Sequence, residues 1–170
     1  MPPNLPDDEI RTAGDRVAHA LVTGRVARRV RGVADIEAQM LLCDAAVAEQ
    51  GGKLHMLGVG WSITSSPTSP QAVAVLLKIP WDRANERLAL VLRLVDDDGR
   101  PVAIATSEGP QELTMGGDIE AGRPPGVTPG SQLDAALAFS VPSLPLPAGR
   151  YQWRLDVADD TFTSSFQVVG

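Results

Sequence analysis

Three consecutive aspartates followed by a glycine form the segment DDDGR, residues 96–100. Carboxylate oxygens gathered at the tip of a β-hairpin can hold calcium, which prefers oxygen ligands. An EF-hand loop is excluded, because its alternating ligands and its final glutamate are missing. Aspartates also favour turns by accepting hydrogen bonds from nearby backbone, and Gly99 supplies the positive φ of a tight turn. A turn is the favoured interpretation, and calcium binding by Asp96–Asp98 stays open.

Cysteine and histidine are too few for most metal sites or thiol chemistry. Zinc needs three or four ligands, and the chain offers Cys43, His19 and His55. A Cys43–His55 dyad is the one conceivable thiol nucleophile, but the expected hairpin break near residue 50 places Cys43 opposite residue 58 or so. Cys43 lies among Leu and Ala and is expected to be a small buried apolar residue.

Other catalytic patterns are also missing. The serines of TSSPTSP and TSSF do not stand in a G-x-S-x-G elbow, and GVGW opens no helix and lacks a Walker lysine. Paired carboxylates for glycoside hydrolysis are not excluded by spacing, but nothing singles out a pair. We therefore predict that the protein is not an enzyme and uses no cofactor and no metal.

Tryptophan holds much of the aromatic area in a chain that is 4% aromatic. Trp61 and Trp153 stand within strand patterns and are expected in the core. Trp81 stands in a loop between Pro80 and Asp82. It either packs over the end of the domain or serves as an exposed interface anchor, so it is a candidate partner-binding residue.

Basic residues gather near the end of the N-terminal segment. Four arginines follow apolar residues at helical spacing: Arg25, Arg28, Arg29 and Arg31. Acidic residues stand at the other end of the segment (Asp7, Asp8 and Glu9), as the dipole of a helix favours. Residues 1–33 hold six arginines and four acidic residues, and residues 34–170 hold nine basic and seventeen acidic residues, which gives +2 and −8. We expect this segment to dock onto protein, either its own acidic domain or a neighbour's, and do not expect nucleic-acid binding.

The order of apolar and turn residues predicts two regions. Residues 1–35 are expected to be a helical arm, and residues 36–170 hold about eight short apolar runs separated by Gly, Pro and Asp. No helix is expected between the runs, so the sheets should be mainly antiparallel. The prediction is an all-β, two-sheet sandwich of immunoglobulin-like or similar topology, with a closed barrel as the alternative.

Particular strands are also predicted. A hairpin around EQGG joins a first strand to a second one that continues through Trp61, with Leu57, Val59 and Trp61 on one face. In RLALVLRLV the leucines from Leu88 to Leu94 share a face, and DDDGR then turns into PVAIATS as a hairpin. Three more strands are expected in SQLDAALAFSV, RYQWRLDVA and TFTSSFQVV.

The N-terminus carries acids where a secretory signal needs positive charge, and apolar runs such as Ala72–Leu77 are too short to span a bilayer. We expect a soluble protein that is not exported by the Sec pathway. It would lie in the cytoplasm or be incorporated in a virion or another assembly, without membrane contact.

Several motifs carry a family resemblance: MLLCDAAVAEQGGKLHMLGVGW, IPWDRAN, LVDDDGRPV, GRPPGVTPG and LPLPAGRYQWRL. Over residues 38–168 the chain resembles an uncharacterised bacterial family of β-sandwich proteins, a domain of unknown function common in actinobacteria. The resemblance implies a structural role for these motifs and no catalytic residue. The first 35 residues fall outside it, either as an addition for assembly or because the true start lies near Met40.

Two functions follow from these observations. The first is a non-enzymatic structural or interaction module, as part of a larger assembly such as a phage particle, in which the arm joins copies or neighbours. The alternative is a domain that binds a small molecule or carbohydrate through Trp81 and the loops at residues 65–70 and 108–130.

Overall fold

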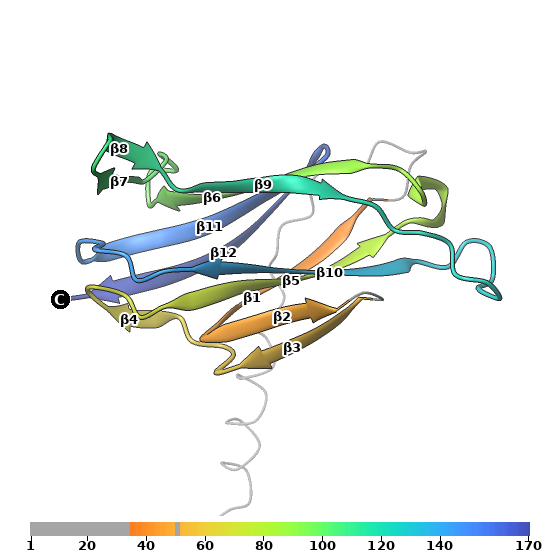
Figure 1. Cartoon of the computed structure of the whole chain (residues 1–170), viewed down its shortest axis with the longest axis horizontal. Helices are drawn as coiled ribbons and strands as arrows, with labels where there is room; N and C mark the ends of the chain where they lie inside the picture. The colour runs from red at the N-terminus through yellow and green to blue at the C-terminus, as the bar shows by residue number, and fades with distance from the viewer. Residues whose placement is uncertain (1–34, 50–51) are drawn as a thin grey trace, which may run out of the picture. The chain divides into compact units, whose positions relative to one another are not determined.

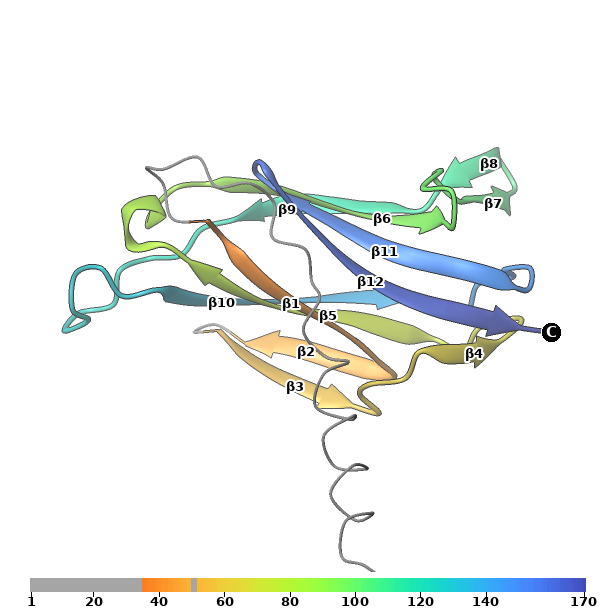
Figure 2. The ribbon, with the colours of Figure 1, turned by 180° about the vertical axis from the view of Figure 1, so that it is seen from behind.

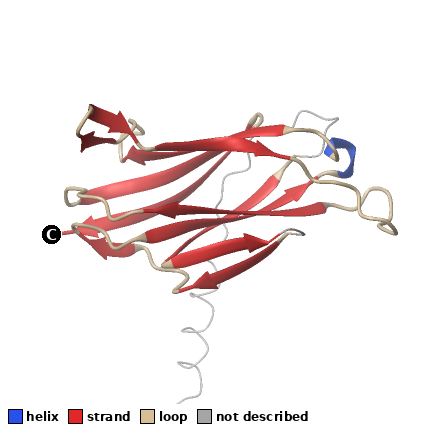
Figure 3. Cartoon of the chain, in the orientation of Figure 1, coloured by secondary structure: helices blue, strands red, loops and turns tan. Residues whose placement is uncertain are grey.

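The computed structural model describes residues 35–49 and 52–170. Within these residues there are twelve β-strands and one three-residue 3₁₀-helix, and no α-helix (Figure 3). The elements are β1 (Glu37–Cys43), β2 (Ala45–Glu49), β3 (Lys53–Leu57), β4 (Ile63–Ser65), β5 (Gln71–Ile79), η1 (Trp81–Arg83), β6 (Leu88–Asp96), β7 (Ala103–Thr106), β8 (Gly109–Glu112), β9 (Thr114–Ile119), β10 (Leu133–Val141), β11 (Gly149–Val157) and β12 (Asp160–Val169). The all-β prediction is confirmed, although the expected number of strands was too low. The predicted helix and its arginines lie outside the described residues.

The strands form two larger sheets and two separate hairpins (Figure 1). One sheet has the order β1-β5-β10 and the other β4-β12-β11-β6-β9, while β2 pairs with β3 and β7 with β8. Neighbouring strands are antiparallel except β4 and β12, which are parallel. The prediction of mainly antiparallel sheets is confirmed.

The main hydrophobic core takes side chains from both larger sheets. In β5 the residues Val73, Val75, Leu77 and Ile79 alternate onto the core face and are at most 1% exposed. The predicted leucine face of β6 meets them, and Trp153 of β11 is fully buried in the same core. Burying one such side chain stabilises the fold by about 1.5–3 kcal/mol, so this core holds the two sheets together.

A smaller core covers the opposite face of β5. There Ala72 and Ala74 lie beside Cys43, and the inner residues of the β2–β3 hairpin, such as Leu54 and Met56, pack against them. Because alanine is small, the hairpin can approach the sheet closely. Figure 1 shows β2 and β3 on the side of β1, β5 and β10 that faces away from β6 and β9. The Ala–Val alternation of β5 therefore serves two cores.

The second predicted strand ends earlier than expected. β3 stops at Leu57, because Gly58 and Gly60 adopt φ of +62° and +96°, outside the strand region. The chain then crosses back to β1, where the amide of Gly60 donates to the carbonyl of Leu42 (2.9 Å). The prediction of one continuous strand through Trp61 was wrong.

The DDDGR hairpin is present only next to the turn. Val95 bridges to Pro101, and the amide of Val102 donates to the carbonyl of Leu94 (2.9 Å). Beyond that point β7 pairs with β8, and β9 takes the place beside β6. Figure 2 shows this small β7–β8 hairpin projecting beyond the end of β6. The expected direct pairing of residues 103–106 with β6 was therefore wrong.

Candidate functional site

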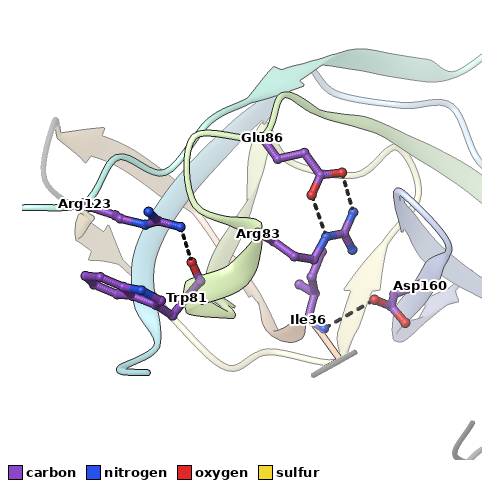
Figure 4. Close-up of polar contacts among 6 residues, drawn as sticks. All are labelled: Ile36, Trp81, Arg83, Glu86, Arg123 and Asp160. Carbon is purple, nitrogen blue, oxygen red and sulfur yellow. Dashed lines mark hydrogen bonds and ion pairs between the residues drawn. The ribbon is translucent and has the colours of Figure 1, made fainter. Parts of the chain in front are cut away.

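Of the predicted partner-binding residues, Trp81 lies within the described part of the chain, and the arginines 25, 28, 29 and 31 lie outside it. Trp81 follows β5 and begins η1, where it is half-buried against the main core. The guanidinium of Arg123 lies 4.9 Å from the centre of its ring, and Nη2 of Arg123 donates to the Trp81 carbonyl (3.1 Å; Figure 4). The indole therefore fastens the loop that follows β9 to this end of β5.

Neighbouring polar groups at this end are paired as well (Figure 4). Nε and Nη2 of Arg83 donate to the two oxygens of Glu86, both at 2.9 Å. These bonds lower the pKa of the Glu86 carboxyl and raise that of Arg83. The amide of Ile36 donates to Asp160 (3.4 Å), which connects the start of β1 to the start of β12. We define Trp81, Arg123, Arg83 and Glu86 as the closed end.

The aspartates of the DDDGR segment form a turn. Oδ1 of Asp96 accepts from the amides of Asp98 (3.0 Å) and Arg100 (2.8 Å), and Gly99 has φ of +77°. The guanidinium of Arg100 donates to Asp98 (2.7 Å). Among residues 35–49 and 52–170, no group of three or more His, Cys, Asp or Glu side chains is arranged to hold a metal ion. The carboxylates of Asp96 and Asp98 are thus used within the turn itself.

Cys43 and His55 lie in different environments. Cys43 is fully buried in the smaller core, its Sγ donates to the carbonyl of Ala72 (3.5 Å), and burial raises the pKa of the thiol. His55 is exposed on β3, and its Nε2 lies 3.0 Å from Oε1 of Glu49. A raised pKa keeps the thiol protonated, which opposes nucleophilic chemistry. The expectation that Cys43 is a small buried residue is confirmed.

The β2–β3 hairpin carries large apolar side chains on its outer face. Val47 is 63% exposed, Leu57 is 70% exposed, and Val59, just beyond β3, is 45% exposed. We call Val47, Leu57 and Val59 the hairpin surface. Next along the chain, Ile63 of β4 is 62% exposed, beside the C-terminal strand β12. Clustered exposed apolar side chains mark interaction sites in soluble proteins more often than isolated ones do.

One edge of the hairpin is also open. Within the described residues β3 pairs with β2 alone, so the amides and carbonyls along its other edge have no strand partner. Such an edge can accept another strand by main-chain hydrogen bonds. The hairpin thus combines the exposed apolar side chains of the hairpin surface with a free strand edge.

A cavity of about 350 Å³ opens between the hairpin and β4, and Gln71, Trp61 and Asp44 line it. Gln71 is only 4% exposed, and neither its Oε1 nor its Nε2 has a hydrogen-bond partner within the described residues. Trp61 is held edge-on against Phe166, with ring centres 5.9 Å apart. The cavity therefore has a fixed aromatic wall and an unpaired buried amide.

A family model matches residues 38–168, from β1 to β12, and its description is a family of unknown function, DUF6941. The chain belongs to the DUF6941 family. No curated protein matches it. The match confirms a domain of unknown function over the predicted range. No helix in the described part of this DUF6941 domain is long and apolar enough to cross a membrane.

Sequence reasoning missed Val47 and Leu57 as exposed residues of the hairpin and Gln71 as a residue that lines a cavity of the DUF6941 domain. Val47 and Leu57 belong to strand patterns in which either face can be buried, so the sequence alone does not show which side meets solvent. Gln71 carried a usable signal. It precedes AVAVLLKI, and strand alternation places its side chain on the same face as Val73 and Val75.

Proposed function

We propose that this DUF6941 protein is a non-enzymatic structural and interaction module that self-associates through the β2–β3 hairpin. The observation that supports this function is the exposure of Val47, Leu57 and Val59 beside the open edge of β3. We also propose that its two larger sheets form a sandwich, and that the protein contributes to a larger assembly such as a phage particle. The bacterial, actinobacterial origin of the family stays a prediction.

The sequence of β3 suits pairing with a second copy of itself. In an antiparallel pair centred on His55, Leu54 of one copy lies opposite Met56 of the other, and Lys53 lies opposite Leu57. No two lysines face each other, so no pair of like full charges opposes the contact. A two-fold contact of this kind uses the same surface on both copies, as most homodimers do.

The test is the mass of the full chain in solution, measured by light scattering over a range of protein concentrations. We expect a dimer or larger species, and we expect the double variant Val47→Lys/Leu57→Lys to be monomeric, because added charges oppose burial of the hairpin surface. The matched control Ala89→Lys/Ala105→Lys adds the same charge to exposed alanines on β6 and β7 and should retain the wild-type mass. A wild-type monomer at all concentrations, or equal masses for both double variants, would contradict the proposal.

The N-terminal segment is proposed as a second contact. Its net charge of +2 complements the −8 of residues 34–170, so arginines 25, 28, 29 and 31 would bind an acidic surface of a neighbouring copy. In the same measurement, replacing all four with glutamine should weaken association at low salt and have less effect at high salt. An unchanged mass at low salt would exclude this role.

The alternative function is binding of a small molecule or carbohydrate. The sequence assigned it to Trp81, but Arg123 lies against that indole ring. The cavity beside Trp61 and the loop at residues 65–70 is better equipped for a ligand.

A further inference from the structure

The cavity beside Trp61 lies at the start of β5, where the core face of the sheet ends. Gln71 pairs with Val141 of β10 and occupies the same face as Val73 and Val75, which lie in the main core. Gln71 is thus the first residue of β5 on that face, and it lines the cavity together with Trp61. Its place in the strand register fixes this position.

Burial of an unpaired amide is costly. A polar side chain that leaves water without a new partner loses about 1–3 kcal/mol of stability. Gln71 leaves both an acceptor and a donor group unpaired within the described residues. Nε1 of Trp153 is also unpaired there, but Trp153 does not line the cavity beside Trp61. Of these two residues with unpaired buried polar atoms, Gln71 is therefore the one that lines this cavity.

Other polar side chains line the cavity together with Gln71. Asp44 contributes a carboxylate, and Thr64 and Ser69 contribute hydroxyls. A second cavity of about 460 Å³ shares Asp44 and Gln71 with the first. Together these residues bring hydrogen-bond acceptors and donors to the lining of the cavity. The carboxylate disfavours an anionic ligand.

We propose that the cavity formed by Gln71, Trp61 and Asp44 binds one neutral sugar ring. Each hydroxyl of a sugar both donates and accepts hydrogen bonds, which matches an amide beside a carboxylate, and the C–H face of the ring packs on an indole. A volume of about 350 Å³ lies at the lower end of the range of small-molecule sites, roughly 300–1,000 Å³. This site is independent of self-association through the hairpin.

The experiment uses the full chain, labelled with ¹⁵N, titrated separately with glucose, galactose, mannose and N-acetylglucosamine at millimolar concentrations. We expect at least one sugar to shift both the side-chain amide signal of Gln71 and the indole signal of Trp61. Failure of all four sugars to shift either signal would overturn the proposal. A shift caused by a neutral dipeptide amide and by none of the sugars would overturn it too, in favour of a peptide ligand.

The variant Gln71→Met gives a second readout. Methionine has a similar length and no hydrogen-bonding amide, so we expect sugar binding to weaken about tenfold or more while Tm rises by about 2–4 °C without sugar. The control Gln39→Met makes the same change at an exposed site on β1 and should alter neither quantity. A lower Tm for Gln71→Met would show that the amide is satisfied inside the protein, and would overturn the proposal.

Discussion

The two ends of strand β5 differ in how their polar groups are satisfied. After Ile79 the chain enters the closed end, where Arg123 covers Trp81 and Arg83 pairs with Glu86. Before Ala72, at the other end, Gln71 has no partner within the described residues and lies beside a cavity. Each end has a tryptophan, but one indole fastens a loop and the other lines an open space.

Paired and unpaired polar groups have opposite effects on the stability of the fold. Groups that are paired within the protein contribute to stability, and their removal should cost free energy of unfolding. A buried group without a partner lowers stability, and such a cost is characteristic of functional sites. The same kind of residue, a tryptophan beside a polar side chain, therefore has opposite consequences at the two ends.

The largest expected effect lies next to Gln71. Thr68 is 2% exposed, and its Oγ1 accepts a hydrogen bond from the buried amide of Leu144 (3.0 Å). Thr68→Val should lower the free energy of unfolding by about 1–3 kcal/mol, because the amide of Leu144 loses its partner. Urea denaturation measures this loss, and Thr68→Ser, which keeps the hydroxyl, should recover most of it. If Thr68→Val were as stable as wild type, unpaired groups would be tolerated throughout this end.

A smaller effect is expected at the closed end. Arg123→Ala removes both the contact with the Trp81 ring and the hydrogen bond to its carbonyl, so the free energy of unfolding should fall by about 1 kcal/mol. Arg123→Lys should recover only part of this, because lysine lacks the planar guanidinium. Thermal unfolding compares the three proteins. No loss in Arg123→Ala would mean that this end does not depend on its polar contacts.

The smallest effect concerns Asp156 on β11. Burial raises the pKa of its carboxyl, but hydrogen bonds from Thr161 and Arg154 and the charges of Arg154 and Arg93 outweigh burial and lower it. A lowered pKa in the folded state stabilises the protein above the unfolded pKa of about 3.9, and this stabilisation is lost as pH falls through the folded pKa. Asp156→Asn should therefore cost up to about 1 kcal/mol at pH 7 and less near pH 3. A cost that is equal at both pH values would show that the charge of Asp156 is not involved.

The strands that were predicted best from the sequence are those whose pattern of apolar and turn residues fits only one secondary structure. β6 has leucine at every second position between turn residues, and β5 ends at Ile79, directly before Pro80, so both follow from local chemistry. The run after Leu57 was misjudged because two glycines permit a strand as well as a reversal. The chain reverses there: both glycines have positive φ, and the amide of Gly60 donates to the carbonyl of Leu42.

The candidate sites were less predictable for a related reason. The closed end could be anticipated from Trp81, although its partner Arg123 stands far away in sequence and lies in a loop without a periodic pattern. The exposed face of Val47 and Leu57 depends on the hairpin packing against β5, which no local pattern encodes. Both features therefore depend on packing between residues far apart in the sequence, which no local pattern shows.

The two cores that meet at β5 limit how this strand can change over evolution. Val75 cannot become larger without disturbing the main core, and Ala74 cannot become larger without displacing the β2–β3 hairpin from the sheet. Strands on the surface of a domain usually have one face that tolerates substitution. Along most of β5 both faces are buried, so this strand should tolerate the fewest substitutions. The β2–β3 hairpin that covers it remains free to diversify on its outer face.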